Sequence, residues 1–586
     1  MWSQLKKKKR EASIAWNHFK KTVEKTHAVS NYCGKAIKTM GNTTNLLNHL
    51  SNVHPERLKD SKGQNHTTAL DVFVGKSTVH YSNDSARKRK IDEMVLSMIA
   101  VDVQPFSCVE DEGFIALLKE MDPRYKLPSR TYLRDVSLPM QYEKCKAKLR
   151  EILNSVDYLA LTTDLWTSRA NEGYITITCH FISSNFKLES AILATQHLLT
   201  PTNHTAANIA DTIKSVLSDW SISEKVVCMV SDNDASMKKA CESLKYKHLP
   251  CVAHTINLLV QDMLKQQFLE DILSRCKTIV AFFKRSSTAY AKFKAAQKAE
   301  NPYGLIQEMP TRWNSAYEMI KRIIITNEHI SVVLAVSHNA PLPLSAEDID
   351  TLKELSLLLA PFADATLSVS TNTNVSISLI IPVVCELCHK INGLQLKTVE
   401  GIAALNYVKM RLRERLFPYE TRTIPRVASI IDPPFKKQEF LSASNAEEAA
   451  KALQEELSSI CITIPRPQPA PPTEEPTRFS FLKTKIEARV QSHRADSLIL
   501  LRQHLEKGNQ PENCDPLEYW KISTEEALKK ISKKFLCIPA SSCESERLFS
   551  KAGQVISDRR TRLSPSVVDK LLFLNKNKNI NKIEIS

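Results

Sequence analysis

Residues 157–164 read Asp-Tyr-Leu-Ala-Leu-Thr-Thr-Asp, a short apolar run that ends in a carboxylate. An apolar run of this length predicts a buried strand, with Asp164 at its end. Residues 174–182 alternate between apolar and polar side chains, which predicts a second strand with one face toward a core. From residue 157 onward, the sequence therefore has the period of a β-sheet.

The order of the segments that follow decides the fold. Residues 188–195 predict a third strand, and residues 205–220 carry apolar side chains at helical spacing. A fourth strand is expected at residues 226–230, with Asp232 just after its end, and a fifth at residues 249–253 after a short helix. The expected order is three strands, a helix, a strand, a helix and a strand. This is the order of an RNase H-like α/β domain, a mixed sheet with helices on its faces.

The composition favours nucleic acid as a partner. The 586 residues include 80 Lys and Arg against 64 Asp and Glu, a formal charge of +16 that suits polyanions. Only 11 residues are glycine, and the sequence has no Gly-rich phosphate loop, so we expect no nucleotide enzyme and no small-molecule substrate. No stretch approaches the roughly 20 apolar residues of a membrane span, so we expect no membrane partner. Basic clusters at residues 6–10 and 87–90 are typical of nuclear localisation signals or of a solvated charged face.

A second informative stretch lies near the end of the chain. Residues 537–553 read Cys-Ile-Pro-Ala-Ser-Ser-Cys-Glu-Ser-Glu-Arg-Leu-Phe-Ser-Lys-Ala-Gly. Ser541, with Glu544 three residues later, predicts a capping box, so we expect a helix to begin here. That helix places Glu546 on the same face as Phe549 and Gly553. Taken alone, Glu546 would be an exposed helix carboxylate.

This stretch resembles the C-terminal dimerisation region of hAT-superfamily DNA transposases. The resemblance is carried by residues 545–550, Ser-Glu-Arg-Leu-Phe-Ser, and extends from residues 515–520 to residues 571–574. It implies a homodimer or higher oligomer, held through Leu548, Phe549 and the apolar run at 571–574.

The same resemblance implies a catalytic triad. Asp164 and Asp232 match the first two carboxylates of the hAT transposases, and Glu546 matches the third. Carboxylate oxygens suit Mg²⁺ or Mn²⁺, and two such ions can stabilise the attacking and leaving oxygens of phosphodiester cleavage. A strand-end turn or a helix cap is the alternative role for each aspartate alone, and Asp234 is a neighbouring candidate ligand.

Two further elements resemble hAT motifs that contact transposon DNA. Cys251 and His254 form a Cys-x2-His motif after the fifth expected strand. A core cysteine with a buried, hydrogen-bonded histidine is the alternative. Arg312 and Trp313 match an Arg-Trp element whose tryptophan stacks on DNA bases near the cleavage site. A core tryptophan is the alternative.

The N-terminal residues resemble a BED-type zinc finger. The implied zinc ligands are Cys33, His49 and His54, and Ser30 stands where the family has its first cysteine. A serine hydroxyl is a poor ligand for Zn²⁺. We therefore expect a degenerate site, in which His27 substitutes, water completes the shell, or zinc is bound weakly.

In this family the finger binds double-stranded DNA. Basic side chains such as Lys35 and Lys38 would then contact phosphates, which position the protein without specifying the base sequence.

These features give an expected division of the chain. The segments are a degenerate zinc finger at 1–60, a linker at 61–85, a helical DNA-binding and dimerising segment at 86–150, the first part of the RNase H-like core at 151–260, an all-helical insertion at 261–463, a Pro-rich linker at 464–477, and a dimerisation region at 478–580 that completes the core.

Two functions fit this division. The first is a nuclear, dimerising DNA-binding protein of the hAT transposase type that cleaves and joins DNA with two metal ions. The second is a transcription regulator derived from such a transposase, which binds DNA and dimerises without catalysis. The intact triad favours the enzyme, whereas Ser30 points to a decaying or repurposed copy. A scaffold that uses only the dimer surface is disfavoured by the finger.

Overall fold

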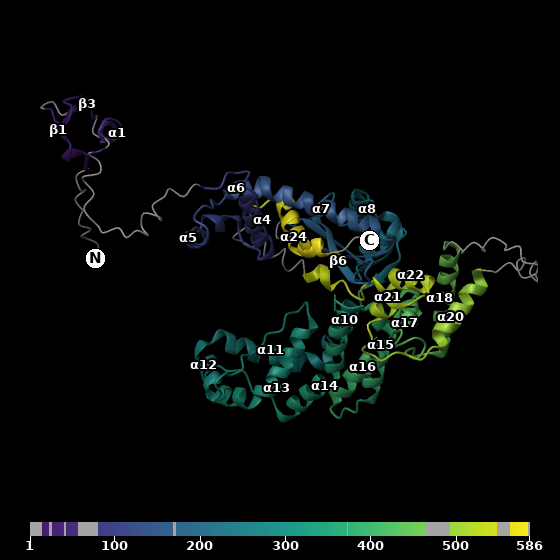
Figure 1. The fold of residues 1–586 in the computed structure, drawn as a ribbon. Helices are drawn as coiled ribbons and strands as arrows, with labels where there is room; N and C mark the ends of the chain where they lie inside the picture. The colour runs from purple at the N-terminus through teal and green to yellow at the C-terminus, as the bar shows by residue number, and fades with distance from the viewer. Residues whose placement is uncertain are drawn as a thin grey trace, which may run out of the picture. The chain divides into compact units, whose positions relative to one another are not determined.

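The computed structural model describes residues 14–22, 26–39, 43–54, 56, 80–167, 171–371, 373–463, 493–547 and 563–583. The chain divides into two compact units, Met1–His80 and Tyr81–Ser586 (Figure 1). The basic cluster at 6–10, residues 61–79 of the first expected linker, the Pro-rich segment 464–477, and Leu548, Phe549 and Gly553 lie outside the described residues.

The smaller unit is a three-stranded antiparallel sheet with one helix. Its strands are β1 (Phe19–Lys21), β2 (His27–Ser30) and β3 (Ala36–Lys38), and its helix is α1 (Thr44–Val53). Phe19 of β1 and Leu46 and Leu50 of α1 are buried together in its core. This small core fixes α1 across the sheet.

The larger unit is built on a five-stranded mixed sheet with the strand order β6-β5-β4-β7-β8. β4 pairs antiparallel with β5 and parallel with β7, and β7 pairs parallel with β8. Helix α8 connects β6 to β7, and α9 connects β7 to β8, which confirms the predicted order. The elements are β4 (Leu159–Thr167), β5 (Gly173–Ile182), β6 (Leu188–His197), α8 (Ala206–Trp220), β7 (Val226–Ser231), α9 (Ala235–Ser243) and β8 (His248–Pro250).

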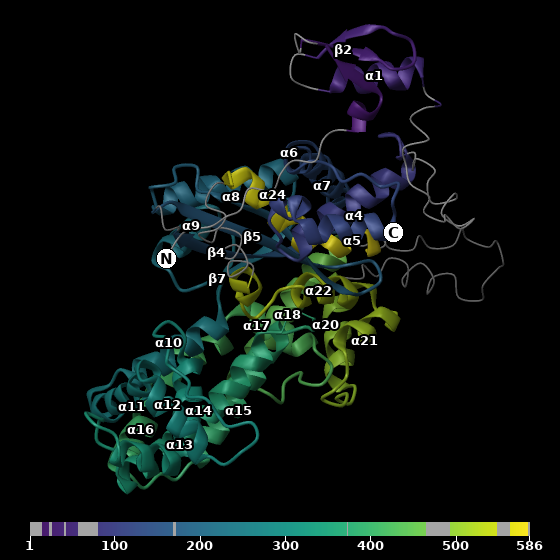
Figure 2. The ribbon, with the colours of Figure 1, turned by 90° about the vertical axis from the view of Figure 1, so that its left-hand side faces the viewer.

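Both faces of this sheet are covered by helices (Figure 2). Because side chains alternate along a strand, Leu159 and Leu161 of β4 enter one core with α7 (Leu138–Ser155) and α8, whereas Ala160 enters a second core with α10 and α22. The second core continues into the helical insertion. The sheet therefore has the buried central position expected of an RNase H-like domain.

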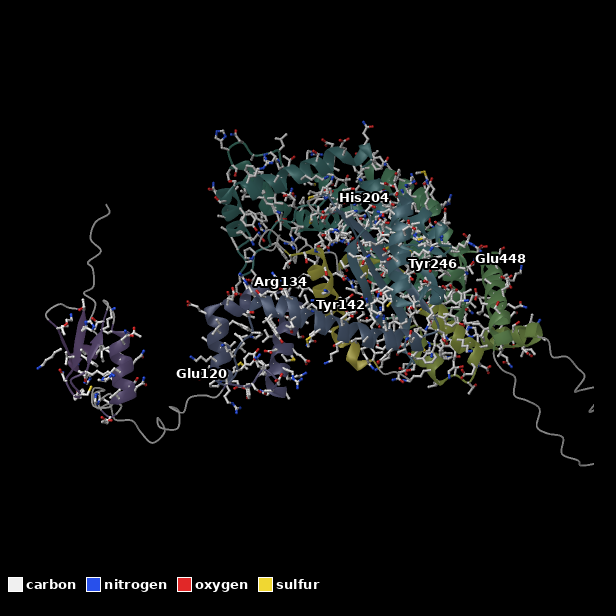
Figure 3. The ribbon with its side chains drawn as sticks, turned by 90° about the horizontal axis from the view of Figure 1, so that it is seen from above. Glu120, Arg134, Tyr142, His204, Tyr246 and Glu448 are labelled. Carbon is white, nitrogen blue, oxygen red and sulfur yellow. The ribbon has the colours of Figure 1, made fainter. Side chains whose placement is uncertain are left out.

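The last long helix, α24 (Pro565–Lys576), returns to the start of the larger unit. Leu571 and Leu572 are buried against α4 (Ala86–Val101), and Phe573 packs 4.7 Å from the ring of Tyr142, measured between ring centroids. Figure 3 labels Tyr142, which lies on α7. The apolar run at 571–574 thus packs mainly within its own chain, and our expectation that it holds a dimer together is wrong for its buried members. Apolar side chains placed on a short helix can meet either a partner or the chain's own core, and here they meet the core.

The insertion is helical, as predicted, and it extends the second core of the sheet. Its helices and those that follow are α10 (Val252–Leu264), α11 (Gln267–Arg285), α12 (Ser287–Ala296), α13 (Trp313–Ala335), α14 (Ala346–Val369), α15 (Ile380–Gly393), α16 (Val399–Arg415), α17 (Thr423–Ile431), α18 (Ala443–Thr463), α20 (His493–Glu506), α21 (Pro516–Ile522) and α22 (Glu526–Leu536). The indole N–H of Trp520 donates to the carbonyl of Ile431 at 3.1 Å, which fastens α21 to α17. Within the described residues, no helix combines the length and the apolar character required to cross a bilayer.

A buried carboxyl at the end of α17 predicts an unusual pH dependence. Asp432 is 3% exposed, and burial raises its pKa to about 7. Since the folded state then binds this proton more tightly than the unfolded chain, the group destabilises the fold at high pH, and stability rises as the pH falls toward 6. The gain from pH 8 to pH 6 is about 1.4 kcal/mol. In Asp432→Asn we expect this part of the pH dependence to vanish, measured as denaturant midpoints at both pH values. Equal pH dependence in the two proteins would contradict it.

Candidate active site and zinc centre

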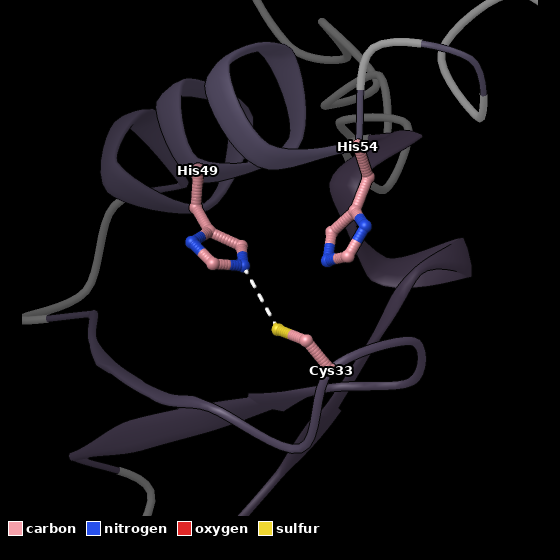
Figure 4. A group of neighbouring side chains, drawn as sticks. All are labelled: Cys33, His49 and His54. Carbon is pink, nitrogen blue, oxygen red and sulfur yellow. Dashed lines mark hydrogen bonds between the residues drawn. The ribbon is translucent and has the colours of Figure 1, made fainter.

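Three side chains of the finger converge on one point (Figure 4). Cys33 lies in the turn between β2 and β3, while His49 lies on α1 and His54 directly follows it. Their ligand atoms all lie within 4.8 Å of one another, and Cys33 Sγ is 3.3 Å from His49 Nε2. His54, the largest cause, lowers the pKa of the Cys33 thiol to about 6. A thiolate beside two imidazoles is a donor set that fits Zn²⁺.

Ser30 and His27 differ in how they relate to these three ligands. Ser30 is 3% exposed, helps to lower the pKa of Cys33, and accepts a hydrogen bond from the Tyr32 amide at 3.3 Å. His27 lies three residues earlier on β2, so strand alternation points it to the opposite face. Its ring contacts Thr26 Oγ1 at 3.0 Å, and it is not among the clustered ligands of the described chain. The expectation that His27 replaces the missing ligand is therefore wrong.

Replacing Ser30 with Cys should restore the fourth ligand. Complete structural zinc sites bind with an apparent free energy of about 10–16 kcal/mol, or roughly 3 kcal/mol for each of four ligands, which corresponds to about 100-fold in affinity. We expect Ser30→Cys to tighten zinc binding by that order, measured by competition with a chelator. Ser51→Cys, which adds a thiol on the exposed side of α1, is the control. Equal affinity in wild type and Ser30→Cys would contradict a defect at Ser30.

The expected phosphate contacts of the finger are accessible. Lys35, the residue before β3, and Lys38, the last residue of β3, are both exposed. Their role in binding DNA remains a prediction.

The carboxylates expected in the larger unit come from three distant stretches. Asp164 lies near the end of β4, and Asp232 follows the end of β7. Because β4 and β7 are parallel, their carboxyl ends meet at one edge of the sheet. Glu546 lies in a helical turn at residues 543–547. Burial raises the pKa of Asp164 to about 7, and the charges of Glu546 and Asp232 are the next two causes. The three carboxylates therefore share one electrostatic environment.

These carboxylates are spread more widely than the zinc ligands. Within the described residues, the group whose ligand atoms all lie within 4.8 Å is the one in the finger. A wider spacing suits a site divided between two ions about 4 Å apart. Asp234 has a structural use instead, since its side chain accepts from the amides of Ser236 at 2.8 Å and Met237 at 3.1 Å and caps α9.

Cys251 is a core residue that fastens the segment carrying Glu546. It is 0% exposed, and its sulfur accepts hydrogen bonds from the amides of His254 at 3.4 Å and Ser542 at 3.3 Å. The amide of Val252 also donates to the carbonyl of Ala540 at 3.0 Å. Because a buried thiol cannot reach DNA, the expected DNA contact by Cys251 is wrong, and the alternative of a core cysteine holds. His254 is half-buried.

Trp313 is also part of the core. It is 3% exposed, begins α13, and packs with its ring centroid 6.0 Å from that of Tyr317. A base cannot stack on a face that is already covered, so the expected DNA stacking by Trp313 is contradicted by its packing. Arg312, the residue before the helix, is exposed and keeps access to solvent.

A buried polar network, which no sequence motif indicated, lies beneath Glu546. Helical structure begins at residue 543, and Glu544 does not form the predicted capping box with Ser541. Instead, Glu544 pairs with Lys576 of α24 and accepts from Ser190 Oγ at 3.0 Å. Ser545 Oγ is hydrogen-bonded to Thr162 Oγ1 of β4 at 2.9 Å. The sequence signal for this network is Lys576, the last residue of α24, which lies two residues after the apolar run at 571–574.

Comparison with protein families matches four parts of the chain. A BED zinc finger matches residues 13–55, the ZBED1 RNase-like domain matches residues 162–255, the ZBED1 RNase-like helical domain matches residues 249–356, and the hAT family C-terminal dimerisation region matches residues 499–578. The chain thus combines segments similar to a BED zinc finger, to the ZBED1 RNase-like domain with its helical part, and to a hAT dimerisation region.

Similar proteins are named either for a BED zinc finger or as transposases. The human zinc finger BED domain-containing protein 4 is 26% identical over 97% of this chain and 52% of its own length. The human zinc finger BED domain-containing protein 6 is 24% identical over 84% of this chain and 56% of its own length. A putative AC transposase of Zea mays is 23% identical over 80% of this chain and 62% of its own length. The chain thus spans about half the length of the two human relatives.

The hAT family domains account for the position of the carboxylates. Asp164 and Asp232 lie in the part that matches the RNase-like domain, and Glu546 lies in the part that matches the dimerisation region. A segment that follows the helical insertion therefore completes the sheet domain, since Ser545 is hydrogen-bonded to Thr162 of β4.

Proposed function

We propose that this protein binds double-stranded DNA in the nucleus as a homodimer or higher oligomer and cleaves phosphodiester bonds with Mg²⁺ or Mn²⁺ held by Asp164, Asp232 and Glu546. The observation that carries the proposal is that Asp164 and Asp232 meet at the carboxyl ends of two paired parallel strands, where the raised pKa of Asp164 has the charges of Glu546 and Asp232 among its causes. Strongly perturbed carboxyls with specific charge partners are typical of functional sites.

The residues divide the proposed work between them. Asp164 is held by the antiparallel pairing of β4 with β5, and Glu546 is held through Cys251 and Ser545. Divalent ions bound by these carboxylates would supply charge stabilisation for the attacking and leaving oxygens. The finger would supply most of the contact with the DNA duplex, with zinc bound by Cys33, His49 and His54.

Nuclear localisation is supported by the overall charge and by one basic cluster. In the cluster at residues 87–90, Lys88 is buried and paired with Asp92 at 2.7 Å, while Arg87, Arg89 and Lys90 are exposed. Lys90 also pairs with Glu93 at 3.8 Å, so Arg87 and Arg89 are the exposed cations of this cluster that remain available to a transport receptor.

A second candidate is a transcription regulator that binds DNA without cutting it. The three-ligand finger favours it, because a copy under selection for mobility would be expected to keep its fourth ligand. In both candidates the protein binds DNA and self-associates. They differ only in whether Asp164, Asp232 and Glu546 bind metal ions and cleave the DNA.

Incubation of the full chain with supercoiled plasmid separates the two candidates. We expect nicked plasmid with Mn²⁺ and none when Mn²⁺ is omitted, while an electrophoretic shift of the same DNA persists in both conditions, with Zn²⁺ present throughout. A shift without nicking at any Mn²⁺ concentration would favour the regulator. Absence of a shift would overturn both candidates.

A further inference from the structure

A cavity of about 430 Å³ opens beside the carboxylate site of the larger unit. Asn233, the residue after Asp232, lines one side, and Lys238 of α9 lies along the same rim. Tyr419 and Arg422, from the segment between α16 and α17, line the other side. The cavity therefore lies where the sheet domain meets the helical insertion.

The walls of this cavity are fixed by hydrogen bonds. Asn233 Nδ2 donates to Thr255 Oγ1 at 3.1 Å, and Thr255 Oγ1 is 2.8 Å from the hydroxyl of Tyr419. That hydroxyl in turn donates to the carbonyl of Pro250 at 2.9 Å. Thr255 and Tyr419 are 3% and 2% exposed. The chain of bonds ties the ends of β7 and β8 to the insertion, so the cavity is a built feature of the fold.

The charges at the rim are not balanced. Arg415 is paired with Asp262 at 2.7 Å, and Glu414 is paired with Arg411. Lys238 is exposed and Arg422 is half-buried, and neither forms an ion pair with a described residue. The net effect is an uncompensated positive charge around the opening.

The positive charge at the rim also affects the pKa of a neighbouring histidine. His248 of β8 is held by Ser231 Oγ at 2.9 Å. Its pKa is lowered to about 4, first by burial and then by Arg422 and Lys238. The two cations therefore act on the same polar region at the ends of β7 and β8.

We propose that this cavity binds a phosphodiester group of the DNA strand that flanks the bond at the carboxylate site, with Lys238 and Arg422 as its two cationic contacts. The inference rests on the proposed function, because it assumes that DNA reaches Asp232. Phosphate contacts of this kind set the register of the strand and are independent of its sequence. Asn233 links the two sites directly, because its backbone follows Asp232 and its side chain lines the cavity.

Charge reversal at the two cations tests the proposal. Lys238→Glu and Arg422→Glu, alone and combined, would be compared in the full chain with Lys239→Glu, an exposed neighbour on the same helix that does not line the cavity. The measurement is the affinity for a fluorescent DNA duplex as a function of salt. Each lost phosphate contact lowers the slope of log K against log salt by about 0.9. We expect the double variant to lose about one such step, because both cations contact the same phosphodiester group, and the control to lose none.

The outcomes are distinguishable. Wild-type protein that binds no DNA would overturn the proposed function itself. If wild type binds DNA and the double variant keeps the same affinity and slope, only the cavity inference is overturned. A double variant no weaker than Lys239→Glu would overturn it equally. Inorganic phosphate is the probe for a small-anion site, and millimolar phosphate that binds wild type but not the double variant, without displacing DNA, would assign the cavity to free phosphate instead. Thermal melting of each variant excludes unfolding as the cause of weaker binding.

Discussion

Glu546→Gln is expected to lower Mn²⁺-dependent nicking of plasmid DNA by at least about 100-fold, the order found when a preorganised charge interaction is removed from an active site. Glutamine keeps the size of the side chain but removes its negative charge. An amide is a weaker ligand than a carboxylate for a hard cation, so the loss should fall on the metal-dependent step. DNA affinity should stay unchanged, because the proposed contacts with the duplex lie mainly in the finger and glutamine keeps the size of the side chain.

A second readout follows from the coupling of the carboxylates. The charge of Glu546 is the largest electrostatic cause, after burial, of the raised pKa of Asp164. Removing that charge should lower the pKa of Asp164, which remains above its ordinary value because burial persists. The shift can be followed by NMR titration of labelled aspartate in the absence of metal.

A control variant at another carboxylate separates the effect of losing one negative charge from the effect of losing a metal ligand. Glu526 of α22 pairs with Lys529 at 3.3 Å, and its side chain is 65% exposed. Glu526→Gln changes the net charge of the same C-terminal region by the same amount and should nick DNA at the wild-type rate. Nicking by Glu546→Gln at that same rate would remove Glu546 from the active site.

The sequence alone was sufficient to predict the sheet and to place Asp164 and Asp232 at the ends of its strands. Strand periods are local, and the order of elements allows few topologies, so Asp164 and Asp232 could be assigned to one sheet edge from residues 157–232 alone. Glu546 could be connected to them only by resemblance, because more than 300 residues intervene and no local pattern shows which helix closes the domain.

The errors have a common physical cause. Cys251 and Trp313 were assigned to DNA and are buried, and the run at 571–574 was assigned to a partner and is packed mainly in the chain's own core. In each case the residue type is equally suited to a core and to an interface. Only the tertiary packing decides between them. The prediction that His27 replaces a zinc ligand is wrong for a simpler reason, because strand alternation turns its side chain away from the zinc ligands.

Lys576→Met is expected to destabilise the larger unit by about 3–5 kcal/mol, the usual cost of removing one partner of a buried ion pair. The side chains of Glu544 and Lys576 are 6% and 21% exposed. Without the ammonium group, Glu544 keeps only Ser190 and a weak contact to His180 at 3.6 Å. The free energy of unfolding, from denaturant titration, measures the loss. Lys578→Met, an exposed neighbour, should change it little.

The pH dependence identifies the ion pair as the cause. The pKa of Glu544 is lowered in the folded protein, through His180 and Lys576, against an opposing effect of burial. The pair therefore stabilises the fold above the ordinary pKa of glutamate, and this stability is lost as the pH falls. In Lys576→Met, acid instead relieves the unpaired charge, so the difference between wild type and variant should shrink on acidification. A constant difference from pH 8 to pH 5 would show that lost packing of the lysine stem is responsible.

The double variant Glu544→Gln/Lys576→Met tests whether this pair also positions the active site. Removing both charges leaves no unpaired ion, so its stability should recover most of the loss of the single variant. Glu544 lies two residues before Glu546 in the same helical turn, and its pairing with α24 fixes that turn over β6. If the tether positions Glu546, the double variant will be stable yet slow to nick DNA. If a stable double variant nicks DNA at the wild-type rate, the contacts made by Cys251 and Ser545 are sufficient to position Glu546.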